Sequence, residues 1–225
     1  MSRMCNGAKM FVDGIIQNAT SSIISHPFLK KFANGEIRDS EVIRRWALAR
    51  YLSSSKFPEL VKSAIAVCGE QDSKLTRVLE KNLRDELKPM PHPEMFRNFL
   101  LSLGIQREEF EAYLRINKTI IYPANIITIM GTKPETIAAV MLVIEVMIGI
   151  ECTEVARGLR TVYGESLDLL FFDFHGVQDL STHLKPFQRI VVDYAVDEVK
   201  RREIDLVVSP TIDSKLSFYD QFRVI

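Results

Sequence analysis

The chain is poor in cysteine, histidine and tryptophan, and it has no net charge. Its 225 residues include three cysteines, four histidines and one tryptophan, and 29 Lys and Arg residues balance 29 Asp and Glu residues. Cys5, Cys68 and Cys152 are odd in number and far apart, which excludes a disulfide framework and a paired-cysteine zinc site. The scattered, balanced charge excludes a field that would attract nucleic acid or an anionic membrane. We therefore expect no nucleic-acid partner and no membrane partner.

The sequence also lacks strand patterns, repeats and a leader. No segment alternates apolar and polar residues with hairpin turns between, as a β-sheet would require. The start, MSRMCNGAKMF, has no apolar stretch of the signal-peptide type, so we expect a cytoplasmic protein. No low-complexity linker divides the chain, and its length suits one domain. The sequence predicts a single all-α domain over residues 1–225, a bundle of about seven or eight helices.

Apolar residues recur at helical spacing along almost the whole chain. Asp39 or Ser40 is the expected N-cap of the longest early helix, and we expect Pro58 to kink that helix. Gly164 is expected to end the long apolar helix. We expect an irregular tail from about residue 209. The predicted helices span approximately residues 8–24, 26–35, 41–67, 72–87, 94–104, 107–114, 118–130, 134–163, 166–174 and 178–206.

A carboxylate interrupts the most apolar segment, AAVMLVIEVMIGIE at residues 138–151. Glu145 is the only charged residue between Ile137 and Ile150. An ionised carboxylate in such surroundings costs many kcal/mol unless it is paired, protonated or bound to a metal. The run is shorter than the roughly 20 residues that a membrane span needs, so it predicts a buried core helix. Two explanations remain open, an ion pair with a buried Arg or Lys and a metal site.

Three of the four histidines stand near carboxylates. Glu86 and His92 flank the prolines of RDELKPMPHPE, and His175, Asp179 and His183 follow one another at steps of four in FHGVQDLSTHL. Four residues of an α-helix advance about 400°, so the last three side chains would form one stripe. Each residue also has an ordinary explanation, as a hydrogen-bonded histidine or a solvated carboxylate. Their coincidence favours a metal site.

Carboxylates and imidazoles without a thiolate suit iron or manganese better than structural zinc. Three of each kind suit two ions better than one. Glu145 in the middle of a helical bundle could bridge the two ions, and this would explain its isolation.

The order of these residue types resembles the heme-oxygenase-like diiron oxidases and oxygenases. The segments HPFLKKFANGEI, EKNLRDEL, FLLSLGIQREEFEAY and IEVMIGIECTEVARGL agree with it, and the resemblance covers most of residues 20–205. The family includes the chlamydial protein associating with death domains, which makes p-aminobenzoate, as well as fatty-acid decarboxylases and N-oxygenases. The resemblance implies a heme-oxygenase-like fold, two Fe(II) ions with O2 as co-substrate, and Glu145 as the bridging, catalytic ligand. The implied metal ligands are Glu86, His92, Glu145, His175, Asp179 and His183.

The chain departs from the family at several positions. The spacings to His92 and His183 differ by about one residue from those of relatives, and Asp85 is an alternative to Glu86. Gly176, directly after His175, permits a helix break that would absorb the second difference. Ile144 and Val155 stand where the p-aminobenzoate maker has a tyrosine and a lysine, which argues against self-sacrificing p-aminobenzoate synthesis.

The same fold suggests alternatives to a diiron enzyme. A thiaminase II-like hydrolase would use Cys152 as nucleophile without a metal, and heme oxygenase would need a proximal histidine such as His26. A non-enzymatic helical binding protein would leave the histidines without a metal. None of these accounts for all six candidate ligands.

The expected substrate is a small organic molecule, an amino acid or its derivative in specialised metabolism, oxidised by N-oxygenation, C–C cleavage, or alkene or nitrile formation. Oxidative decarboxylation of a fatty acid is the alternative. Arg50, Lys56 and Arg157 are candidate anchors for a substrate carboxylate. The prediction leaves room for an external electron donor and a homodimer.

Overall fold

The computed structural model describes residues 3–69, 71–88, 90–117, 121–178 and 182–222. Within these ranges every regular element is a helix. The prediction of an all-α fold is therefore confirmed.

The helices in the first part of the chain precede a long central helix. They are α1 (Arg3–Ser25), α2 (Pro27–Ala33), α3 (Ser40–Cys68), α4 (Ser73–Asp85), α5 (His92–Ser102), α6 (Arg107–Ile116) and α7 (Ile121–Met130). The central helix and the elements after it are α8 (Pro134–Tyr163), α9 (Leu170–Asp173), the wide single turn η1 (Phe174–Gln178), α11 (Leu184–Tyr194) and α12 (Glu198–Asp220). In the described ranges the helices outnumber the seven or eight predicted.

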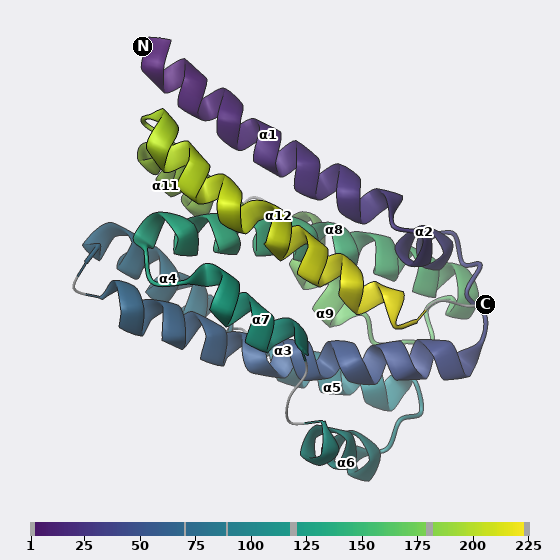
Figure 1. Ribbon diagram of the computed structural model, residues 1–225. Helices are drawn as coiled ribbons and strands as arrows, with labels where there is room; N and C mark the ends of the chain where they lie inside the picture. The colour runs from purple at the N-terminus through teal and green to yellow at the C-terminus, as the bar shows by residue number, and fades with distance from the viewer. Residues whose placement is uncertain (1–2, 70, 89, 118–120, 179–181, 223–225) are drawn as a thin grey trace.

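The long apolar helix α8 lies at the centre of the bundle. It packs against α1, α2, α11 and α12 and also contacts α7, α9 and η1. Figure 1 shows α1 and α12 running side by side across one side of the molecule and α3 along the opposite side. Every residue from Ile137 to Met147 is buried. Because neighbours cover all its faces, α8 is apolar all round.

Helix α8 is also the one helix in the described ranges that is long and apolar enough to cross a membrane. Its most apolar 18-residue window has a mean hydropathy of 2.0, and 83% of that window is buried inside the protein. This burial agrees with the predicted core helix.

Several predicted helix boundaries are confirmed by their caps. The carboxylate of Asp39 accepts a hydrogen bond from the backbone N–H of Glu41 at 2.9 Å, so Asp39 is the N-cap of α3. Gly164 ends α8 with a φ of +61°, a conformation that glycine adopts without strain. Pro58 lies inside α3, and the helix continues through it.

The predicted irregular tail from residue 209 is wrong. Helix α12 continues through Pro210 to Asp220. Its buried residues Val208, Ile212 and Tyr219 recur at helical spacing on the face that packs against α8 and α7. Their burial outweighs the one backbone hydrogen bond that proline removes. The single predicted helix at 178–206 is instead divided between α11 and α12.

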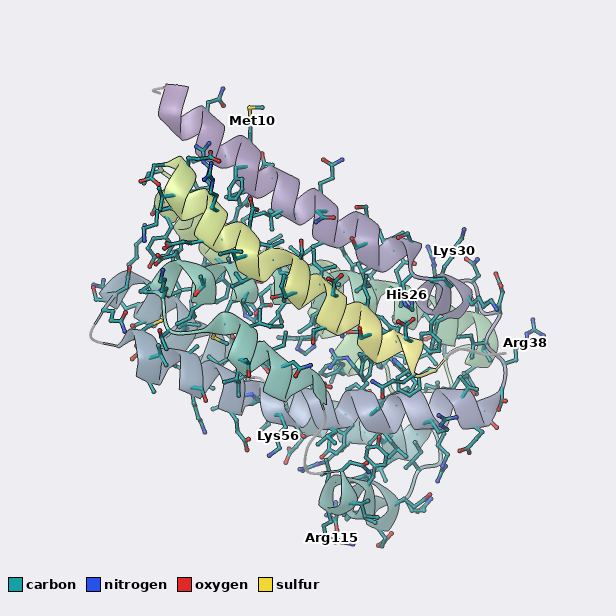
Figure 2. All side chains as sticks on the ribbon, in the orientation of Figure 1. Met10, His26, Lys30, Arg38, Lys56 and Arg115 are labelled. Carbon is teal, nitrogen blue, oxygen red and sulfur yellow. The ribbon has the colours of Figure 1, made fainter. Side chains whose placement is uncertain are left out.

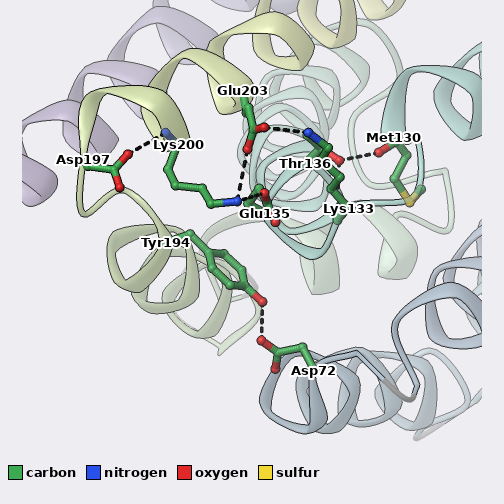
Figure 3. Close-up of polar contacts among 9 residues, drawn as sticks. All are labelled: Asp72, Met130, Lys133, Glu135, Thr136, Tyr194, Asp197, Lys200 and Glu203. Atoms are coloured by element: carbon green, nitrogen blue, oxygen red, sulfur yellow. Dashed lines mark hydrogen bonds and ion pairs between the residues drawn. The ribbon is translucent and has the colours of Figure 1, made fainter.

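Polar contacts hold the ends of these helices in register (Figure 3). Lys200 at the start of α12 binds Glu135 at the start of α8, and it also contacts Glu203 at 3.2 Å. The hydroxyl of Tyr194, the last residue of α11, donates to the carboxylate of Asp72, the N-cap of α4, at 2.5 Å. Through this bond α11 is tied to the helix that positions part of the candidate site.

Replacing Gly158 by alanine should destabilise the protein. A Cβ at Gly158 would lie 1.9 Å from the backbone oxygen of Phe32, so α2 would have to move away from α8. Overpacking of this kind costs about 1–3 kcal/mol, more than the roughly 1 kcal/mol that alanine gains in helix propensity. Thermal denaturation should show a lower Tm.

The matched control is Gly14→Ala. A Cβ at Gly14 would meet nothing within 4 Å, so this variant in α1 should be as stable as the wild type or more stable. Equal Tm values for the two variants would show that α2 and α8 tolerate the added methyl group.

Candidate metal centre

Glu86, His92 and His175 meet from three different elements. Glu86 follows the last turn of α4, His92 is the first residue of α5, and His175 lies in η1. Oε2 of Glu86 lies 2.9 Å from Nδ1 of His92, and Nε2 of His175 lies 2.9 Å from the same nitrogen. One ligand atom from each side chain lies within 4.8 Å of the other two. Because metal–ligand bonds are about 2 Å long, atoms this close can share one ion.

A short proline-rich turn brings Glu86 and His92 together. The backbone N–H of His92 donates to the carbonyl oxygen of Glu86 at 3.0 Å and closes the turn. Pro91 is the N-cap of α5 and Pro93 lies in its first turn, where a missing N–H leaves no helical hydrogen bond unmade. Pro91 and Pro93 therefore favour a helix that begins at His92, the candidate metal ligand.

The geometry of His175 prepares one ring nitrogen for a metal. Nδ1 lies 2.7 Å from the carbonyl oxygen of Phe171. Since a carbonyl can only accept, Nδ1 donates and Nε2 keeps its lone pair toward Glu86 and His92. Burial and then the positive charge that His92 can acquire hold the pKa of His175 well below its usual value. The ring is thus neutral, as a metal ligand must be.

Glu145 and His183 lie in a second group beside the first. Nδ1 of His183 lies 3.9 Å from Oε2 of Glu145, and its Nε2 lies 3.3 Å from a carboxylate oxygen of Asp85. The amide of Asn82 donates to Oε1 of Glu145 at 3.0 Å. Asn82 lies in the last turn of α4 and Glu86, its C-cap, follows four residues later, so this end of the helix contacts both groups. The contacts described for Glu145 are thus with an amide and an imidazole.

The structure brings five of the six predicted ligands together, and Asp179 lies outside the described residues. It places Glu86 with His92 and His175, and Asp85 with His183. The predicted single helical stripe of late ligands is wrong. The predicted helix break is confirmed, because Gly176 has a non-helical ψ of −121°. His183 is the N-cap of a new helix, α11, so the two histidines approach the site separately.

A cavity adjoins both groups, and its wall has three parts. The candidate ligands on it are Glu86, His92, Glu145 and His175. Its apolar wall consists of Phe57, Leu60, Ile126, Ile144, Ile148 and Phe171. Its remaining lining residues are Arg50, Ser53, Ser54, Lys56 and Lys215.

The residues on which the alternatives depend lie elsewhere. Cys152 is completely buried and is not among the described residues that line the cavity. His26, labelled in Figure 2, packs on the ring of Tyr219, and its Nε2 lies 3.2 Å from a carboxylate oxygen of Asp220. Neither the thiol nor this imidazole therefore faces the cavity in which a substrate or heme would bind.

The three predicted anchors differ in position. Arg50 is buried on the cavity wall. Lys56 also lines the cavity, but its side chain is 41% exposed and pairs with Glu59. Arg157 donates to the carbonyl oxygen of Ala33 on a different surface. Of the three, only Arg50 is both buried and in the cavity.

Sequence reasoning missed three buried polar residues near the site, namely Asn82, Glu151 and Lys215. Asn82 stands one turn before Glu86 on the apolar side of α4. Its spacing of four residues from a candidate ligand could have indicated in the sequence that Asn82 lies near the site. Glu151 directly follows the apolar run, and Lys215 fell in the supposed tail. Glu151 and Lys215 pair between two helices that are far apart in the chain, so no short sequence pattern predicts their contact.

Comparison with known proteins gives the chain a family context. A family model described as "Iron-containing redox enzyme" matches residues 44–208. The chain is 31% identical over 103 residues to a protein of Chlamydia muridarum named 4-aminobenzoate synthase, a match that covers 45% of this chain and 42% of that protein. A protein of the same name from Chlamydia pneumoniae is 25% identical over 162 residues, 70% of either chain. The chain thus matches less than half the length of the first of these relatives.

Solved structures share the fold. A TenA homologue from Pseudomonas syringae pv. tomato superposes with a TM-score of 0.69 at 12% identity, over 94% of this chain and 90% of that one. A CADD-like protein of unknown function from Nostoc punctiforme gives a TM-score of 0.74 at 13% identity, over 98% and 97%. At such low identity the similarity shows the fold alone. It agrees with the predicted heme-oxygenase-like bundle.

Proposed function

The chain belongs to the iron-containing redox enzyme family, and from this membership we propose that it is a non-heme diiron enzyme that uses O2 to oxidise a small organic substrate. The observation that supports the proposal most directly is the convergence of Glu86, His92 and His175 within 4.8 Å beside a cavity. Glu145 and His183 form the neighbouring group, which in this proposal provides ligands for a second iron.

The donor set fits iron. Carboxylate oxygens and imidazole nitrogens without a thiolate suit Fe(II), and Glu145 is a buried carboxylate on the cavity that Glu86, His92 and His175 also line. In this proposal Glu86, His92 and His175 would hold one ion, His183 and Asp179 would hold the other, and Glu145 would be a ligand to both. Two ferrous ions held there would supply the electrons that reduce O2.

The protein's own residues orient the ligands and keep water out. Asn82 donates to Glu145 and so leaves its second oxygen, Oε2, directed at His183. The Phe171 carbonyl fixes the tautomer of His175, and the rings of Phe171 and Phe174 pack on the two imidazoles with centroids 4.2 and 5.0 Å away. An apolar surround of this kind tunes a metal site and limits the access of water.

We propose an amino acid or an amino-acid derivative as the substrate, with fatty-acid decarboxylation as the alternative. The chlamydial relatives are named 4-aminobenzoate synthases. Ile144 lines the cavity with an apolar side chain, and Val155 is buried outside its described lining. Both differ from the tyrosine and lysine that the family resemblance implies for self-sacrificing synthesis. A cytoplasmic location, an external electron donor and a homodimer stay predictions.

Anaerobic addition of Fe(II) to the metal-free protein should give about two irons per chain. Ligands held at a hundred times their dissociation constant stabilise a fold by about 2.7 kcal/mol, so the Tm should rise by roughly 5–10 °C. Exposure to air should then produce O2 consumption that depends on added organic acid. A protein that binds less than one iron and shows no rise in Tm would contradict the proposal.

A matched pair of variants tests the second iron position. His183→Ala should reduce the iron content to about one per chain, because it removes an imidazole that faces Glu145. Thr182→Ala changes the adjacent residue and should leave about two irons. Equal iron content in both variants would show that His183 is not a ligand.

A further inference from the structure

A second buried polar cluster lies on the wall of the same cavity. Arg50 of α3, Glu151 of α8 and Lys215 of α12 are 3%, 0% and 1% exposed. Nε of Arg50 donates to Oε2 of Glu151 at 3.0 Å, and Nζ of Lys215 donates to the same oxygen at 2.7 Å. The proposed iron site does not use these three residues.

Among the described residues, the cluster consists of the two cations Arg50 and Lys215 around the carboxylate of Glu151. Burial raises the pKa of Glu151, but the nearby cations Arg50 and Lys215 lower it by more than burial raises it. The net pKa is below its usual value, so the carboxylate is ionised. Burial lowers the pKa of Lys215 to about 8, although Glu151 opposes this shift. Both cations thus donate to the same carboxylate oxygen of Glu151.

The cations face the cavity, and the carboxylate stands behind them. Arg50 and Lys215 line the cavity, whereas Glu151 is not among its described lining residues. Arg50, Ser53 and Ser54 lie at i, i+3 and i+4 on α3 and so share one face. Ser54 accepts a hydrogen bond from Arg50 at 2.6 Å. The hydroxyl of Ser53 is buried on the cavity wall without a hydrogen-bond partner among the described residues.

One aromatic ring separates this cluster from the candidate metal ligands. The Cζ atom of Arg50 lies 5.7 Å from the centre of the Phe171 ring, and that ring lies 4.2 Å from the ring of His175. The cavity wall also includes the apolar residues Phe57, Leu60 and Ile148. One cavity therefore offers hydrogen-bond donors with positive charge, apolar surface and the candidate metal ligands, with the Phe171 ring between the cations and His175.

We propose that Arg50, Lys215 and Ser53 bind the carboxylate of the substrate and direct its apolar body toward the metal ligands. This inference rests on the proposed function only in identifying the bound carboxylate as the substrate's. The anion site itself is present without iron. A carboxylate matches the site because it is negatively charged and has two oxygens that can accept from guanidinium, ammonium and hydroxyl donors together.

Binding of hexanoate and hexanamide, measured by calorimetry, tests the proposal. The two probes have the same apolar chain and differ in the charge of the head group. Metal-free wild-type protein should bind hexanoate at least about tenfold more tightly than hexanamide, as expected for hydrogen bonds to a charged group. Lys215→Met should remove this preference, and Ser53→Ala should reduce it. Equal binding of the two probes by the wild type would overturn the proposal.

Lys62→Met is the matched control, because Lys62 is an exposed lysine on the same helix as Arg50 and lies outside the cavity's described lining. It should keep the preference for hexanoate. If Lys215→Met fails to fold, Lys215→Gln and Ser53→Ala supply the same comparison. Unchanged hexanoate binding in a folded Lys215 variant would also overturn the proposal.

Repeating the titration anaerobically with Fe(II) separates this inference from the proposed function. If hexanoate binds only after iron is added and Lys215→Met has no effect, the carboxylate binds the metal and the anion site is wrong. If the protein binds no iron but the Lys215-dependent preference persists, the anion site stands and the diiron proposal fails.

Discussion

Glu145→Ala is expected to reduce the iron content from about two per chain to nearly none. In the proposed centre Glu145 serves both ions, so its removal deprives each of a ligand, whereas loss of an outer ligand affects one ion. The neighbouring side chains of Asn82 and His183 cannot take the place of Glu145, because neither has a carboxylate whose two oxygens could bind two ions. The increase in Tm on addition of Fe(II) should disappear with the iron.

The metal-free form of this variant separates lost binding from lost folding. Glu145 is 6% exposed, and burying its carboxylate in apolar surroundings has a desolvation cost. The metal-free variant should therefore be about as stable as the metal-free wild type. Glu154→Ala, on the same helix but outside the cavity's described lining, should keep both irons. Full iron occupancy in Glu145→Ala would show that Glu145 is structural.

Glu151→Gln is expected to cause the largest loss of stability of the substitutions considered. The amide keeps the shape of the side chain but leaves Arg50 and Lys215 buried without their shared carboxylate. Breaking a buried ion pair from one side costs about 3–5 kcal/mol. For a chain of this size, that corresponds to a fall in Tm of about 6–20 °C.

Glu154→Gln, three residues further along α8, is the control. Glu154 is 20% exposed and forms an ion pair with Arg157, which is 59% exposed, so water reaches this pair, unlike the buried pairs of Glu151. Exposed pairs contribute about 0–1 kcal/mol, so urea denaturation should show little change. Equal unfolding free energies for the two variants would contradict the central role of Glu151.

Local signals in the sequence predicted the helices well. The bounds of α8, its apolar character and the caps at Asp39 and Gly164 follow from residues that are neighbours in the chain. The tail was mispredicted because Ser209-Pro210 has the composition of a helix end. The apolar spacing that continues beyond Pro210 stabilises α12 only through contacts with other helices.

The candidate site was predicted by residue type more than by geometry. His92 and His175 were identified because they stand near carboxylates and prolines or glycine in the chain. Their meeting at 2.9 Å depends on the turn after α4 and on η1, which periodicity does not reveal. Arg50, Glu151 and Lys215 come from three distant helices, so no spacing in the sequence announces their contact.

The position of Lys215 on the last described helix has a consequence for biosynthesis. A ribosome releases the chain from the N-terminus onward, so Glu86, His92, Glu145 and His175 emerge before α12 does. Until α12 packs against α8, the cavity lacks the wall that Lys215 provides. A nascent chain that has not yet formed α12 would therefore already contain these candidate ligands while one side of their cavity is open.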